Sequence, residues 1–114
     1  MYVTDVDFSN VRGDFVTTME RMFTGCNNLS DILYFGNMNL PKLTNTSYMF
    51  YNTPNNGSNK FRINISNIDV NKLVNYTNMF TYASGDVYVK GSDILFYQRK
   101  TGANTHRISF SPAQ

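Results

Sequence analysis

A chain of 114 residues supports one domain with a modest hydrophobic core, and its formal net charge of +2 is too small to indicate a nucleic-acid partner. No stretch approaches the ~20 apolar residues that a membrane-spanning helix needs, and the single Cys excludes an internal disulfide. The first residues have neither the basic start nor the apolar run of a signal peptide. Such a start is compatible with a fragment of an exported protein and with a complete product such as a virion component.

The most regular feature is a Met-Phe pair that occurs three times, at Met22-Phe23, Met49-Phe50 and Met79-Phe80. The steps between the pairs are 27 and 30 residues, which is typical of stacked repeat units. Regular recurrence is better explained by core packing than by an exposed stripe, so these Met and Phe residues are predicted to be buried.

Short strands are predicted before each Met-Phe pair, because apolar residues recur there at two-residue spacing. The residues 16 and 14 positions before each Met are Val6 and Phe8, then Leu33 and Phe35, then Ile63 and Ile65. An Asn follows each of these strands, and Asn favours turns. A fourth strand is predicted at Val87 and Val89.

Between each strand and its Met-Phe pair, apolar residues recur at intervals of about three and four, as in Val16, Met19 and Met22. This spacing predicts a short helix or helical turn. Units of strand, turn and helical turn bury their apolar faces only by stacking. The sequence therefore predicts a repeat solenoid over residues 1–91, with about three such units and a fourth strand, and a surface loop inserted at residues 53–59.

Residues 92–114 are predicted to be a C-terminal cap of the same domain, which covers apolar surface that the last unit would expose. One alternative is a short helix that begins near Ser92 and is followed by an edge strand around Phe110. The other alternative is a hairpin of residues 94–99 with residues 105–110.

Several stretches carry a family resemblance, and they are Asp7-Phe8-Ser9-Asn10, Val16-Thr17-Thr18-Met19, Met22-Phe23-Thr24-Gly25-Cys26-Asn27-Asn28-Leu29, Val87-Tyr88-Val89, Gly91-Ser92 and Tyr97. They resemble the BspA-type leucine-rich repeats of bacterial surface proteins, in the Met-Phe-rich form common in mycoplasmas and gut bacteria. The resemblance covers roughly residues 5 to 97. It implies a right-handed, leucine-rich-repeat-like solenoid with a sheet on one side, used for adhesion or for binding proteins and host molecules rather than for chemistry.

If the apolar strand residues face the core, the residues between them face outward, because side chains alternate along a strand. The best candidates for a binding face among them are Tyr34, Arg62, Asn64 and Tyr88, since Tyr and Arg often anchor interfaces and Tyr with Asn suits a glycan. An ordinary solvated sheet surface is the alternative. The full outward strip is Asp5, Asp7, Ser9, Ile32, Tyr34, Gly36, Arg62, Asn64, Ser66, Asp86 and Tyr88.

Catalysis, a cofactor and a metal site are not predicted. Cys26 stands where the other units carry Thr53 and Ala83, so a slot for a small residue explains it. The only His, His106, lies in the cap. One Cys and one His provide neither a nucleophile with a positioned base nor a metal-ligand set.

The sequence thus predicts a non-enzymatic interaction or adhesion module of bacterial-surface type, located at the cell surface or outside the cell. Its partner would be another protein, from the host, the envelope or a virion, or a glycan. The alternative is a structural or decorating component of a bacteriophage virion.

Charge is unevenly distributed along the chain. Residues 1–31 contain five acidic and two basic residues, whereas residues 87–114 contain four basic residues and one acidic residue. The first strand is also predicted to have an unpaired edge, and such edges favour association. Head-to-tail or other edge-mediated self-association is therefore a further expectation.

Overall fold

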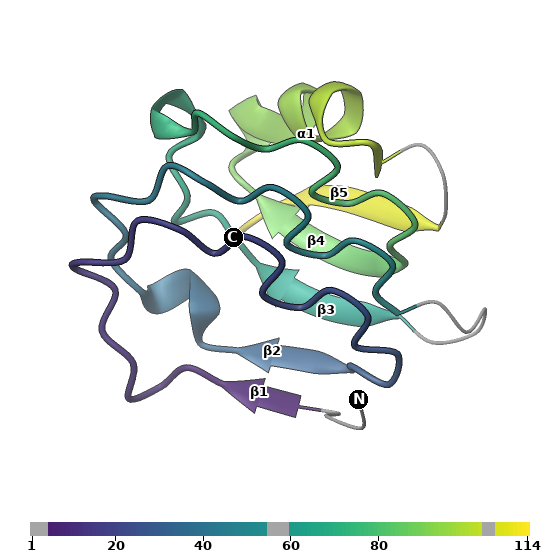
Figure 1. Cartoon of the computed structure of the whole chain (residues 1–114), viewed down its shortest axis with the longest axis horizontal. Coiled ribbons are helices and arrows are strands. Elements are labelled where there is room, and N and C mark those ends of the chain that lie inside the picture. Colours follow the sequence, from purple (N-terminus) through teal and green to yellow (C-terminus); the bar gives the residue numbers. More distant parts are fainter. Residues whose placement is uncertain (1–4, 55–59, 104–106) are drawn as a thin grey trace.

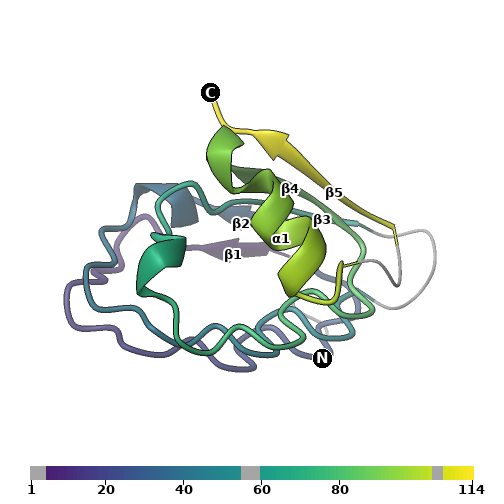
Figure 2. The same ribbon diagram turned by 90° about the horizontal axis from the view of Figure 1, so that it is seen from above.

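The computed structural model describes residues 5–54, 60–103 and 107–114, and it arranges them around one parallel sheet (Figure 1). The five strands lie in the order of the sequence: β1 (Asp5–Asp7), β2 (Asp31–Leu33), β3 (Phe61–Asn64), β4 (Gly85–Val89) and β5 (Ile108–Pro112). The helices are the short 3-10 turns η1 (Phe35–Asn37), η2 (Val70–Lys72) and η3 (Gly91–Asp93) and the α-helix α1 (Ile94–Lys100). Figure 2 shows α1 beside β5, with which it is in contact.

After each of the first three strands the chain crosses to the far side of the core and returns through a Met-Phe segment (Figures 1 and 2). These segments lie side by side, because Phe23 N donates to Met49 O and Phe50 N donates to Met79 O, both at 2.8 Å. Parallel bridges also join Thr18 to Asn45 and Asn45 to Asn75. Each unit therefore satisfies its backbone polar groups through the next unit as well as internally.

The helix predicted in the Met-Phe segments is wrong, because these segments consist of β-turns. In the first unit, Met22 N donates to Met19 O and Cys26 N donates to Phe23 O. The third residue of each turn has a positive φ, 59° at Arg21 and 73° at Gly25. A right-handed helix needs negative φ throughout, so the apolar spacing here reflects successive turns. Positive φ recurs in the other two units at Tyr48, Asn52, Asn78 and Tyr82.

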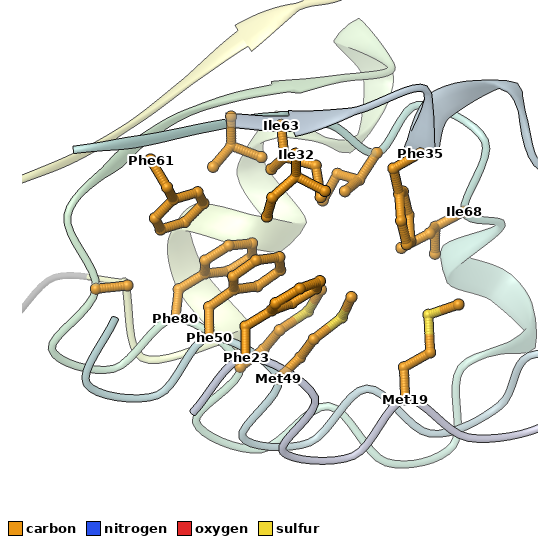
Figure 3. Packing of buried hydrophobic residues seen from close by; sticks show 14 of the residues in the cluster. Met19, Phe23, Ile32, Phe35, Met49, Phe50, Phe61, Ile63, Ile68 and Phe80 are labelled. Atoms are coloured by element: carbon orange, nitrogen blue, oxygen red, sulfur yellow. The ribbon is translucent and has the colours of Figure 1, made fainter. Parts of the chain in front are cut away.

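The core contains a stack of Phe rings (Figure 3). The Phe50 ring stacks on Phe23, Phe61 and Phe80, with ring centroids 5.3, 4.8 and 5.1 Å away. These four rings are buried. Such stacking adds to the hydrophobic free energy of burying each ring.

Of the Met-Phe residues, Phe23, Met49, Phe50, Met79 and Phe80 are buried. The prediction is wrong for Met22, whose side chain is 42% exposed. Met49 and Met79 have described chain on both sides, whereas Met22 belongs to the first unit and has such a neighbour on one side only. Met19 is buried in that unit instead and points into the core in Figure 3.

The predicted facing of β2 is also wrong. Val6 aligns with Ile32 rather than with Leu33, and Ile32 points into the core (Figure 3) while Leu33 is 41% exposed. The physical reason is Tyr34, which has a left-handed conformation with φ 63°. It places two residues between the inward Ile32 and Phe35, so the two-residue alternation is broken there.

The cap adopts the helix-and-strand alternative, and the predicted hairpin is wrong because β5 pairs parallel with β4. The Tyr97 ring of α1 packs against Phe80 and Phe110, and Phe80 N donates to Thr101 O at 2.9 Å. The cap thus covers the third unit. Parts of the cap and of the predicted 53–59 loop, residues 104–106 and 55–59, lie outside the described residues.

Candidate binding face

The outer face of the sheet begins with a row of polar residues, one from each strand. The strand register aligns Asp5 with Asp31, Asp31 with Arg62, Arg62 with Asp86, and Asp86 with Ser109. Arg62 forms an ion pair with Asp31 (2.8 Å from Nη2 and 3.0 Å from Nε to Oδ1). Because the Arg62 side chain is 62% exposed, this pair contributes little to stability.

Asp86 lies on the other side of Arg62 in this row and has partners of its own. Ser109 Oγ donates to Asp86 Oδ1 at 2.9 Å, and Lys60 Nζ lies 3.8 Å from the same oxygen. The row is therefore a set of exposed, mostly paired charges. These charges lie at the surface rather than in a buried ionic site.

Nearer the carboxyl ends of the strands, the outer face carries exposed large side chains among polar ones. Leu33, Tyr34 and Tyr88 have side chains that are 41%, 56% and 36% exposed. Asn64 lies beside Tyr88 in the strand register. Asp31 aligns with Arg62, so Asn64 also lies beside Leu33 and separates it from Tyr88.

Asn64 has a local structural task. Its Oδ1 accepts hydrogen bonds from Ser66 N (2.9 Å) and Ser66 Oγ (2.7 Å), which turns the chain after β3. Gly36 leaves room for this side chain, since a Cβ added at Gly36 would lie 2.9 Å from Asn64 Cγ. The oxygen of the Asn64 amide is thus occupied, although the residue lies on the predicted face.

Tyr34 lies after the end of β2 rather than within it, at the position that precedes η1. A shallow hollow of about 250 Å³ adjoins it and is lined by Phe8, Ser9, Val11, Tyr34, Asn37 and Met38. A bulky residue in the left-handed region is uncommon and carries backbone strain. The protein maintains that strain at a residue that is 56% exposed.

The structure brings most of the predicted strip to this face. Ile32 does not belong to it, because its side chain is buried in the core. Leu33 is exposed in its place. No sequence signal indicates this, because the two-residue spacing of Leu33 from Phe35 predicts the opposite facing. The other predicted strip residues are exposed or half-buried: Asp5, Asp7, Ser9, Tyr34, Gly36, Arg62, Asn64, Ser66, Asp86 and Tyr88.

The groups considered for chemistry lie elsewhere. Cys26 is 3% exposed, and its burial raises the pKa of the thiol, which disfavours the reactive thiolate. His106 lies outside the described residues. Within the described part of the chain, no three His, Cys, Asp or Glu residues form a group that could hold a metal ion. The expectation that the chain is not an enzyme stays a prediction.

A comparison with protein families finds one family model that matches the repeated part of the chain. The family described as "Mycoplasma protein of unknown function, DUF285" matches residues 3–87, which includes all three Met-Phe units. The chain belongs to this family. DUF285 is associated with BspA-like surface repeat proteins, which agrees with the resemblance at the level of the family. No curated protein and no solved structure matches the chain.

The DUF285 match ends within β4, so it covers the repeated units and leaves the α1–β5 cap outside. None of the helices among residues 5–54, 60–103 and 107–114 has the length and hydrophobicity that crossing a bilayer requires.

Proposed function

We propose that this DUF285 protein is a non-enzymatic interaction module of the BspA-type surface class, which binds a partner protein through the outer face of its sheet. The observation that carries the proposal is the exposed group Leu33, Tyr34 and Tyr88 beside the charged row of Asp31 and Arg62. Aromatic and Arg residues dominate binding energy at protein interfaces, and a polar surrounding provides specificity.

The proposal includes a short leucine-rich-repeat-like solenoid as the scaffold. Its support is the stacking of units through two ladders, one in the sheet and one in the Met-Phe segments. In such a scaffold the side chains between the core positions are free to vary from unit to unit. Leu33 and Tyr88 lie on strands, which hold side chains more rigidly than loops do.

The strain at Tyr34 supports a role for its ring. Residues in sparsely populated backbone regions persist when the surrounding structure holds them, and they gather at functional sites. In the Met-Phe turns, the left-handed positions carry Gly25, Asn52 and Asn78, which tolerate this conformation, but also Arg21, Tyr48 and Tyr82, which do not. Tyr34 differs from these residues by its place, because it follows β2 at the end of the sheet. The exposed Tyr34 side chain beside β2 is therefore the residue that we expect a partner to contact.

The proposal is tested by the binding of fluorescently labelled protein to cultured animal epithelial cells, measured by flow cytometry. We expect saturable binding that trypsin treatment of the cells abolishes. The variant Tyr34→Asn/Tyr88→Thr should bind at least about tenfold more weakly, because two aromatic anchors are removed. Loss of binding after enzymatic removal of cell-surface glycans, with trypsin without effect, would instead favour a glycan partner.

The matched control is Tyr82→Asn, because Tyr82 is also an exposed Tyr with positive φ but lies in a Met-Phe segment rather than on the sheet face. It should bind like the wild type. Equal binding by the sheet-face variant and the wild type would contradict the proposed face. Fractionation of the native source distinguishes a cell-surface location from the virion alternative. A surface module is recovered with the cell envelope, whereas a virion component is recovered with phage particles.

A further inference from the structure

The two ends of the sheet differ in charge and in covering. β1 and β5 are its outermost strands and lie at opposite ends (Figure 1). The first unit is poorly covered at its end, since Val11, Phe15 and Met22 are 46%, 82% and 42% exposed. Terminal units of a repeat array normally have a polar outer surface, because they have no neighbour to bury them.

Among the described residues, nothing pairs with the outer side of either edge strand. Phe8 N donates to Leu33 O, so alternation directs the backbone groups of Val6 toward β2 and those of Asp5 and Asp7 toward the open edge. At the other end, Gly85 N donates to Arg107 O and Ala113 N donates to Val89 O. The backbone groups of Ile108 and Phe110 therefore face outward from β5.

We infer that the β5 edge of one copy pairs in parallel with the β1 edge of a second copy, which continues the sheet head to tail. The pleat supports one register, with Phe110 opposite Val6 on the core side and Ser111 opposite Asp7 on the outer side. Phe110 N would donate to Asp5 O, and Asp7 N would donate to Phe110 O. In this register every core-facing residue meets a core-facing residue, as in the existing strand pairs.

Charge complementarity favours this occupant. The β1 end carries the exposed carboxylates of Asp5, Asp7 and Glu20, whereas the cap carries exposed Arg99, Lys100 and Arg107. Opposite charges at the two ends attract successive copies.

Symmetric pairing of like edges is disfavoured. Two β1 edges related by a two-fold axis would run antiparallel and place Asp5 and Asp7 of both copies opposite one another, which is destabilising. Two β5 edges paired about Phe110 would involve Pro112 of both copies, which has no N–H to donate, whereas the head-to-tail register involves Pro112 of one copy. A head-to-tail contact leaves a free edge on each copy, so it produces open chains, or rings where the rotation closes, rather than a two-fold dimer.

The test is sedimentation equilibrium of the 114-residue protein over a range of concentrations at low and high salt. We expect the weight-average mass to rise beyond that of a dimer and to fall when salt is added. A monomer at all concentrations, or a plateau at the dimer mass, would overturn the inference.

A charge exchange locates the contact. Ser111→Glu places a carboxylate opposite Asp7 of the next copy, so the association constant should fall about two- to fivefold. Adding Asp7→Lys to the same chain should restore it, because the facing pair is then Lys and Glu. Asn71→Glu makes the same change of charge at an exposed residue of η2 and should leave association unchanged.

Thermal denaturation of each variant, at a concentration where it is monomeric, shows whether the fold is retained. If Ser111→Glu folds and associates like the wild type, or if the double variant stays as weak as Ser111→Glu, the proposed register is wrong. The variants leave Leu33, Tyr34 and Tyr88 in place, so failure here does not affect the proposed binding face.

Discussion

Phe50 and Tyr34 are both large aromatic residues of the second unit, yet Phe50 is fully buried and Tyr34 is 56% exposed. Phe50 lies between rings of neighbouring units, with interplanar angles of 15° or less. Tyr34 has a strained backbone and adjoins a shallow hollow. Contacts between units thus determine the core of this protein. The outer surface, by contrast, carries side chains such as Tyr34 that packing within the fold does not require.

The largest expected effect is on the inside. Phe50→Ala should lower the free energy of unfolding by about 3–5 kcal/mol, because it removes a buried ring and leaves a cavity between three others. This is a large share of the stability of a small domain, so we expect the whole array to unfold at a much lower temperature. Leu95→Ala, at a residue that is 56% exposed, is the control. Thermal denaturation followed by circular dichroism checks this, and equal melting temperatures would contradict the role of the Phe stack.

The second prediction compares one repeat position in two units. Met49→Ala should cost about 2–5 kcal/mol, since Met49 is fully buried. Met22→Ala should cost about 1 kcal/mol or less, because its side chain is already 42% exposed. Urea denaturation of the two variants at low protein concentration gives both values. Equal losses of stability would show that Met22 is buried in solution. The low protein concentration matters, because self-association at high concentration would also bury Met22.

The third prediction concerns a polar group on the inside. The Tyr97 side chain is 1% exposed, and its hydroxyl has no hydrogen-bond partner within the described part of the chain. Removing such a hydroxyl avoids its desolvation cost, so Tyr97→Phe should raise the free energy of unfolding by about 1 kcal/mol at neutral pH. Urea denaturation measures this. A loss of stability would show that the hydroxyl has a partner.

The same variant has a pH signature. Burial, with a smaller contribution from the charge of Asp93, raises the pKa of Tyr97 far above its usual value of 10.0. The folded state therefore keeps Tyr97 protonated, whereas the unfolded chain ionises it above about pH 10. Wild-type stability should fall as the pH rises above 10, and the advantage of Tyr97→Phe should grow there. A constant difference between the two proteins from pH 8 to 11 would contradict this assignment.

The sequence predicted the inside better than the outside. The recurrent Met-Phe pairs and the apolar positions of β1, β3 and β4 follow from burial, which leaves a periodic pattern. The facing of β2 was not predictable, because a single left-handed residue, Tyr34, shifts it and Tyr carries no preference for that conformation. The exposure of Met22 was not predictable either, since its unit has the same pattern as the covered units and differs only in its neighbours.

The binding face was predicted in part for the same reason. Arg62 and Tyr88 follow from alternation along regular strands, whereas Leu33 was assigned to the core. Apolar spacing of three and four is common to helices and to the observed turns, so the sequence predicts a short helix or helical turn in the Met-Phe segments. Only the positive φ of residues such as Arg21 and Tyr48 distinguishes them, and neither residue type indicates it.

The smallest expected effect is on the outside. Tyr34→Asn replaces a residue that is strained at φ 63° by one that tolerates this conformation, and the ring that is lost is mostly exposed. We expect the free energy of unfolding to rise by about 0.5 kcal/mol. Tyr88→Asn makes the same chemical change within β4, where Asn is disfavoured, so it should lower stability slightly. Urea denaturation of both variants would reveal this opposite sign. If Tyr34→Asn destabilises the fold as much as Tyr88→Asn does, the ring supports packing and its strain is no longer evidence for a partner. If it stabilises the fold and also weakens cell binding, the chain gives up stability at Tyr34 for recognition.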